Sequence, residues 1–196
     1  TINGRGIRIP WDGVTITTDS IELRNGSTIQ AATVGDGAAG NIQITATDRM
    51  IMSDDPTTSG TKTRPSGVFA VSFGDAGLGD QGPAGAITIE TGQLEMSGGA
   101  RIDSTTQSSG RGGNVTITTT NEVSLSGARP AFPFEDQTTN LGSSRPSGIF
   151  SRTVGSAPDT CTGLCGDAGN ISITTGFLNV TDGAAINSGT TSTGKG

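Results

Sequence analysis

The stretch AGNIQIT at residues 39–45 recurs as GGNVTIT at 112–118 and as AGNISIT at 168–174. AGAITI at 84–89 is a fourth copy, and GVTIT at 13–17 is a degraded fifth. Self-similarity of this kind is the signature of a repeat architecture, in which each unit buries its apolar side against its neighbours. The whole chain is therefore best interpreted as a series of similar units.

The spacing of the copies indicates that short and long units alternate. Units 13–40 and 86–113 are each 28 residues long, and 170–196 is a third short unit that stops near the end of its repeat. The long units are 41–85, with 45 residues, and 114–169, with 56. Residues 1–12 are interpreted as the end of a preceding coil.

Apolar residues alternate with polar ones in three short segments of each unit, which is typical of half-buried strands. The segments would stack with like residues above like, and the first would form a core ladder of Ile16, Ile44, Ile89, Ile117 and Ile173. The inward residues of the second segment are Ile21/Leu23, Met50/Met52, Leu94/Met96, Val123/Leu125 and Leu178/Val180, and those of the third are Ile29, Val68, Ile102, Ile149 and Ile186. This pattern predicts an all-β fold, a parallel β-helix (β-solenoid) of about five coils with three strands per coil. Right-handed winding is expected because parallel crossover connections are right-handed.

The corner between the first two segments also alternates. From the last inward residue of the first to the first of the second takes five steps in short units, as from Ile16 to Ile21, and six in long ones, as from Ile44 to Met50. We expect Asn41, Asn114 and Asn170, at the start of their units, to form a corner ladder of stacked amides.

Loop insertions account for the extra length of the long units. They lie near 54–65, 74–85, 127–146 and 155–169 and are rich in Gly, Pro, Ser and Asp, as surface loops are. Two of them end in a shared phrase, RPSGVF at 64–69 and RPSGIF at 145–150.

Alternation points the two aromatic residues of that phrase, Phe69 and Phe150, away from the core. One hypothesis is that the insertions fold back over these rings, with Phe132 and Phe134 contributing. The other is that the rings form an exposed apolar stripe that binds a partner.

Composition excludes several chemistries. The chain has no His, which removes Ser-His-Asp and Cys-His relays and His-ligated zinc. With no Tyr, one Trp and a net charge of −6, a nucleic-acid partner is not expected. No apolar run approaches the ~18 residues of a membrane span, and no basic segment leads into an apolar one as in a signal peptide.

The phrases GDAGNISITTG at 166–176, LNVTDGAAI at 178–186 and PSGIFS at 146–151 resemble the repeats of filamentous-haemagglutinin-like large exoproteins. The resemblance covers residues 13–196 and implies a secreted protein of the extracellular space or cell surface. It implies a segment of an extracellular filament or adhesin shaft. The secretion domain typical of the family is not visible in the sequence.

In such a secreted context, Cys161 and Cys165 of CTGLC are expected to close a small disulfide. The same spacing is half of a metal site, but the partners that a metal would need are missing in a chain without His. We expect no metal and no cofactor.

Two other functions stay open as alternatives. Thr pairs along the first segment, such as Thr116/Thr118, resemble the ladder of ice-binding solenoids, although Gln43 and Glu90 interrupt it. Carboxylates could serve a carbohydrate-binding or carbohydrate-cleaving β-helix. However, Glu22 and Glu95 lie two coils apart with Ile51 between them, and Asp103 shares its position with Gln30 and Asn187, so solvated surface charge is expected. The chain is predicted not to be an enzyme.

The ends of the stack determine the expected partners. A stacked-strand protein presents unpaired backbone groups at both ends. We therefore expect either head-to-tail self-association or continuation in a longer chain. A surface glycan, or a ligand on a host or neighbouring cell, is a further possible partner for the insertions.

Overall fold

The computed structural model describes residues 13–34, 37–54, 65–73, 82–107, 109–130, 144–154 and 166–190. These residues form strands and connecting turns, and within them no helix is long and apolar enough to cross a membrane. The described part of the chain is all-β. Its strands are β1 (Val14–Arg24), β2 (Thr28–Gln30), β3 (Thr33–Val34), β4 (Ile42–Ser53), β5 (Gly67–Phe69), β6 (Ser72–Phe73), β7 (Ile87–Ser97), β8 (Arg101–Asp103), β9 (Val115–Ser126), β10 (Ala128–Pro130), β11 (Ser144–Pro146), β12 (Gly148–Thr153), β13 (Ile171–Thr174), β14 (Phe177–Thr181) and β15 (Ala185–Thr190).

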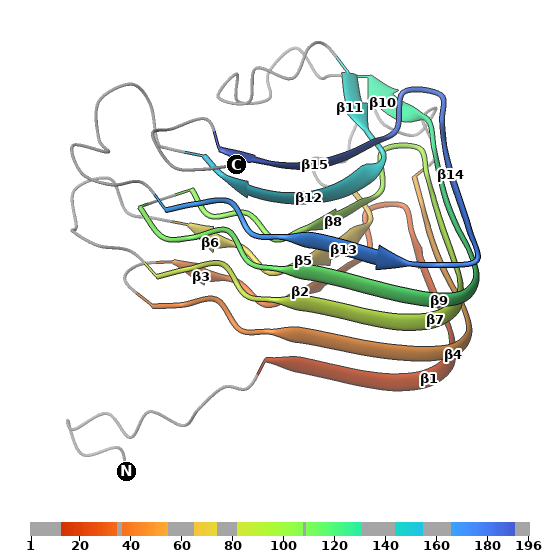
Figure 1. Ribbon diagram of the computed structural model, residues 1–196, viewed down its shortest axis with the longest axis horizontal. Helices are drawn as coiled ribbons and strands as arrows, with labels where there is room; N and C mark the ends of the chain where they lie inside the picture. The colour runs from red at the N-terminus through yellow and green to blue at the C-terminus, as the bar shows by residue number, and fades with distance from the viewer. Residues whose placement is uncertain are drawn as a thin grey trace.

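Two parallel sheets contain most of these strands. The first has the order β1-β4-β7-β9-β13, with β14 also paired to β9, and the second has the order β15-β12-β8-β5-β2. In Figure 1 the strands of each sheet rise in chain order, with β1 at the bottom and β15 near the top. Beside them lie a short parallel pair, β3 with β6, and an antiparallel hairpin, β10 with β11.

We call each successive passage through both sheets a layer. Layer 1 is β1 to β3, layer 2 is β4 to β6, layer 3 is β7 and β8, layer 4 is β9 to β12, and layer 5 is β13 to β15. The parallel pairing of consecutive layers confirms the all-β class and is compatible with a β-helix.

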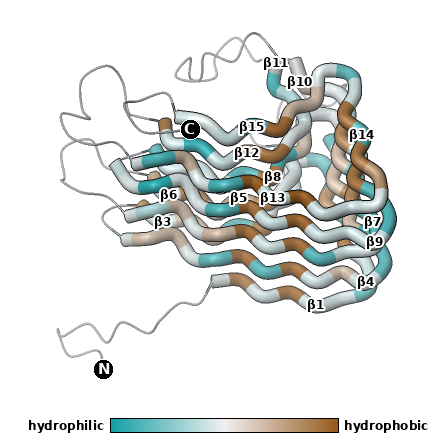
Figure 2. The backbone as a smooth tube through the Cα atoms, in the orientation of Figure 1, coloured by the Kyte–Doolittle hydropathy of each residue, from teal (hydrophilic) through white to brown (hydrophobic). Residues whose placement is uncertain are grey.

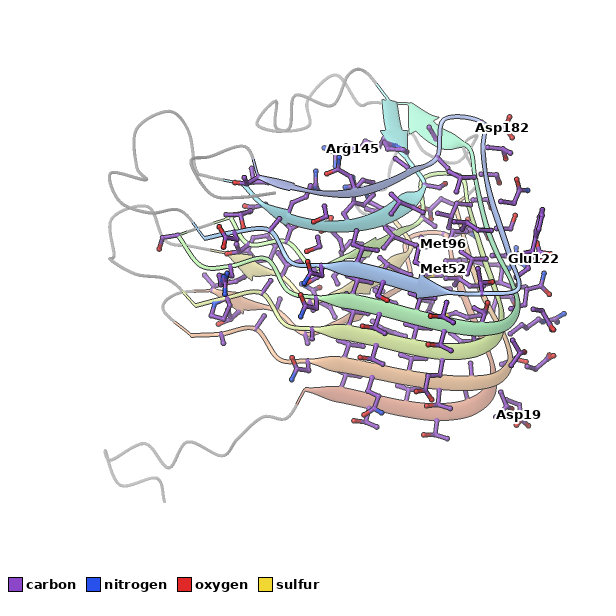
Figure 3. All side chains as sticks on the ribbon, viewed as in Figure 1. Asp19, Met52, Met96, Glu122, Arg145 and Asp182 are labelled. Atoms are coloured by element: carbon purple, nitrogen blue, oxygen red, sulfur yellow. The ribbon has the colours of Figure 1, made fainter. Side chains whose placement is uncertain are left out.

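The core lies between the two sheets. The register pairs Ile16 with Ile44, Ile44 with Ile89, Ile89 with Ile117, and Ile117 with Ile173, so these residues form one file across the layers. Figure 2 shows such files as brown bands that cross the strands at matching positions. In Figure 3 Met52 and Met96 project into the space between the sheets, where they are 0% and 2% exposed. Because the side-chain period of a strand is two residues, the in-register pairing keeps the residues of each of these files on the inner face.

Each long layer carries an extra residue at the corner of the first sheet. The pairing shifts between Thr18 and Ser20 in β1, between Ala46 and Arg49 in β4, and between Thr91 and Gln93 in β7. The same shift separates the β13 and β14 pairings with β9. The alternation of five and six steps predicted from the sequence is confirmed by this register.

The residues that precede the first strand of each layer, Gly-Asn in layers 2, 4 and 5 and Gly85-Ala86 in layer 3, form a second corner. A Cβ on Gly113 would lie 2.1 Å from the carbonyl oxygen of Gly85 and 2.3 Å from Oγ of Ser104, so only glycine fits there. The hydroxyl of Ser104 donates to the Gly85 oxygen at 2.6 Å, and that of Ser151 donates to the Gly113 oxygen at 2.7 Å. These bonds join the two sheets at the corner in layers 3 and 4.

The amides of this corner differ from the predicted ladder. Oδ1 of Asn41 accepts a hydrogen bond from the backbone N–H of Ala86 at 2.9 Å, and Oδ1 of Asn114 accepts one from the N–H of Asn170 at the same distance. Amide-on-amide stacking of Asn41 with Asn114 is wrong, because Ala86 of layer 3 lies between them. The amides of Asn41 and Asn114 instead bind the backbone of the following layer.

Candidate functional site

The outer face of the second sheet holds the first candidate site. The register places Phe150 beside Asp103 on one side and beside Asn187 on the other, and it places Phe69 beside both Gln30 and Asp103. Ile149, the neighbour of Phe150, packs in the core, whereas Phe150 does not belong to that core cluster. The file on this outer face is therefore amide, aromatic, carboxylate, aromatic, amide.

Arginines cover the Phe150 ring. The guanidinium carbons of Arg101 and Arg152 lie 4.3 and 4.9 Å from the ring centroid, within cation–π range. The ring also lies across Gly148, where an added Cβ would be 2.8 Å from Cζ of Phe150. Phe150 is consequently 1% exposed, and Phe69 is half-buried.

The hypothesis of a bare aromatic stripe that binds a partner is wrong for Phe150, because so little of its surface remains accessible. Most of the insertion at 127–146 that was expected to cover the ring, with Phe132 and Phe134, lies outside the described residues.

Asp103 joins the two arginines. Its Oδ2 lies 3.3 Å from Nη2 of Arg152 and 3.8 Å from Nη1 of Arg101, and its Oδ1 accepts a hydrogen bond from the hydroxyl of Thr105. The side chains of Asp103 and both arginines are 8–10% exposed. The expectation that Asp103 is a solvated surface charge is therefore wrong: it is the carboxylate of a buried ionic cluster.

Chemically, this Asp103 cluster is packed rather than open. The carboxylate is occupied by two cations and a hydroxyl, so it is not placed to act as a general base or nucleophile on a bound substrate. Breaking such a cluster is costly because it strands a buried charge. The arrangement links side chains of layer 3 to side chains of layer 4.

The outer face of the first sheet holds the remaining polar candidates. The register aligns Thr15, Gln43, Thr88, Thr116 and Ser172 in one file and Thr17, Thr45, Glu90, Thr118 and Thr174 in the next. Ile51 lies between Glu22 and Glu95 in a third file. Within the described ranges, no group of three or more Cys, Asp or Glu side chains gathers as a metal site would require.

The upper end of the stack is the second candidate site. Here Leu178, Val180 and Ile186 are 45%, 40% and 37% exposed, whereas their partners Val123, Leu125 and Ile149 in layer 4 are 0% exposed. An open hollow of about 500 Å³ lies at this end, lined by Asn170, Ile171, Ile173, Ile186 and Ser188. The apolar files thus reach the surface at layer 5.

Cys161 and Cys165, the predicted disulfide, lie outside the described residues.

A scan against protein-family models, a search of the curated proteins and a search of the solved structures each found no significant match to this chain.

Sequence reasoning missed the Asp103 cluster although all its members were in view. Arg101 and Asp103 are two residues apart on one strand, and so are Phe150 and Arg152 on the next. Residues two positions apart on a strand share a face. The available signal for the cluster was therefore a charged residue two positions from another polar or aromatic residue, repeated on adjacent strands.

Proposed function

We propose that the layers are coils of a right-handed parallel β-helix with three strands per coil, and that the protein is a non-enzymatic, secreted structural protein. It would serve as a segment of an extracellular filament or adhesin shaft. The observation that carries the proposal is the set of unbroken apolar files, fully buried through layers 2 to 4. They run along the same axis as the inter-layer backbone hydrogen bonds.

A stack held in this way resists local opening. In the two large sheets, each strand of layers 2 to 4 is hydrogen-bonded to a strand on either side. The backbone N–H of Ile42 in layer 2 donates to the carbonyl oxygen of Ala86 in layer 3, and the N–H of Val14 in layer 1 donates to the carbonyl oxygen of Asn41 in layer 2. Because edge strands are where sheets fray and where proteases bind extended backbone, inner layers are protected. Stiffness and protease resistance are the properties that an extracellular shaft needs.

Limited trypsin digestion followed by mass spectrometry tests this. The side chain of Arg49 in layer 2 is 58% exposed, but its backbone is fixed between β1 and β7. We expect no cleavage after Arg49 in the native protein and rapid cleavage in denaturant. Rapid native cleavage there would contradict the proposal.

Incubation with polysaccharides provides the opposing test. We expect no release of reducing ends or unsaturated products, because Glu22 and Glu95 are separated by Ile51 and Asp103 is buried. Cleavage that is lost in Glu95→Gln would show that the protein is a carbohydrate-active enzyme instead.

A further inference from the structure

Layer 5 is built like a layer that has another above it. In the described part of the chain, β13 and β15 are the last strands of their sheets. Their inward residues continue the buried files of layer 4 yet remain partly exposed.

Asn170 adds a second, polar observation. At the same corner, Asn41 and Asn114 each accept a hydrogen bond from the backbone N–H of the following layer. Layers 1 and 3, the other short layers, carry Gly13 and Ala86 at this position. Asn170 thus places an amide acceptor at the rim of the hollow. In layers 2 and 4 the equivalent amides, those of Asn41 and Asn114, bind the layer that follows.

Layer 1 has the shape that would fit. Its inward residues have the same spacing as those of layer 5, and neither layer has the extra corner residue of the long layers. The two sets are Val14, Ile16, Ile21, Leu23 and Ile29 in layer 1, and Ile171, Ile173, Leu178, Val180 and Ile186 in layer 5.

The turns of the two layers also match. Asn25 and Gly26 have φ of 55° and 83°, and Asp182 and Gly183 have φ of 52° and 80°. The N–H of Ser27 donates to the oxygen of Arg24 at 3.2 Å, and that of Ala184 donates to the oxygen of Thr181 at 3.0 Å. Two consecutive left-handed residues closed by such a bond form the same tight turn. The layers could stack from Gly13 to Gln30 with no shift in register.

We infer that layer 5 binds layer 1 of a second copy of this chain, head to tail, with Val14 of the second copy over Ile171 and Ile29 over Ile186. The inference rests on the proposed shaft function. In this joint the N–H of Gly13 meets Oδ1 of Asn170, as the N–H groups of Ala86 and Asn170 meet the amides below them.

Outward residues are compatible with the joint. In this register Glu22 lies over Asn179, Arg24 over Thr181 and Gln30 over Asn187, so no like charges meet. Matched amide and hydroxyl neighbours on adjacent strands are favourable. A head-to-tail contact of this kind does not close on itself and therefore propagates as a filament.

Site-directed cross-linking tests the joint. Thr15 and Ser172 are at opposite ends of one file, and the register places them in contact only between copies. In a Cys161→Ser/Cys165→Ser background, the pair Thr15→Cys/Ser172→Cys with a short bis-maleimide should give a ladder of multimers. Each single cysteine should stop at dimers, and Thr15→Cys/Thr181→Cys should give far fewer multimers because Thr181 lies on a different strand.

Sedimentation as a function of protein concentration gives an independent readout. Ile173→Lys should abolish association by placing a charge in the joint, whereas Thr174→Lys, which points outward from the same strand, should not. Circular dichroism checks that both variants keep the strand content of the parent.

Two results would overturn the inference: a parent protein that stays monomeric with no multimer ladder, or equal ladders from the matched and mismatched cysteine pairs. If such monomers still resist trypsin at Arg49, the proposed shaft function survives and only the joint is wrong. If Arg49 is cleaved as well, both fail.

Discussion

At the residue scale, Asp103 supplies a negative charge to two buried arginines. Arg101 and Arg152 stack on Phe150 and converge on this one carboxylate. Cation–π contact and the ion pairs both act against the cost of removing water from the guanidinium groups. Removing the carboxylate would take away an ion-pair partner that both guanidinium groups share at low exposure.

We therefore expect Asp103→Asn to destabilise the protein by about 3 kcal/mol, the cost of removing one partner from a buried ion pair. Urea unfolding followed by circular dichroism measures it. Glu90→Gln, an exposed carboxylate on the first sheet, is the matched control and should change stability by less than about 0.5 kcal/mol. Equal effects would show that the Asp103 cluster contributes little.

Sequence alternation predicted the outward direction of Phe150, and one hypothesis had the ring covered by an insertion, but the contact with Arg101 and Arg152 was not predicted. Direction follows from the period of the strand, which local sequence contains. Burial depends on Arg101, which is far away in sequence and becomes a neighbour only through the pairing of β8 with β12. The Asp103 cluster was missed although the predicted file of Ile102 and Ile149 already placed its two strands in register, because register alone does not show which way the long side chains of Arg101 and Arg152 turn.

At the scale of the strand, the burial of an inward side chain depends on whether layers lie on both sides of its strand. Ile117 in β9 is 0% exposed between Ile89 and Ile173, whereas Ile16 in β1 is half-buried with Ile44 on one side. The same side chain thus occupies two levels of burial within one file. The repeats made the file itself predictable, because like residues recur at like positions, but repeats cannot tell how much each member is covered.

The substitution Ile117→Ala should cost about 4 kcal/mol, since it removes buried methyl groups and leaves a cavity between two layers. Ile16→Ala should cost less than half as much, because water can fill the space. Thermal and urea unfolding of both variants measure this difference. Equal costs would mean that Ile16 is covered in solution. The head-to-tail joint would cover it at high protein concentration, so the comparison should be repeated with dilute protein.

Over the whole molecule, local stability is expected to vary from layer to layer along the stack. In the described residues, strand pairing joins each layer to its immediate neighbours, so the free energy is approximately a sum of layer and interface terms. Layers 2 to 4 have two interfaces and layers 1 and 5 have one in the described part of the chain.

Native-state hydrogen exchange should follow this order. We expect the slowest exchange for the amides of β4, β7 and β9, and faster exchange for β1, β13 and β15. Mass spectrometry of peptic fragments resolves these strands. Uniform exchange across all layers would mean that the molecule opens in a single concerted step.

The alternating corner limits how such a protein can change in length over evolution. A duplication or deletion that copies one layer would place two layers of equal length side by side and remove a register shift that the rest of the sheet contains. An event that copies a short and a long layer together preserves every existing neighbour relation. Genes for relatives of this chain should therefore grow and shrink in steps of two layers, and two layers of equal length should meet only at the ends of the stack, as layers 5 and 1 do in the proposed joint.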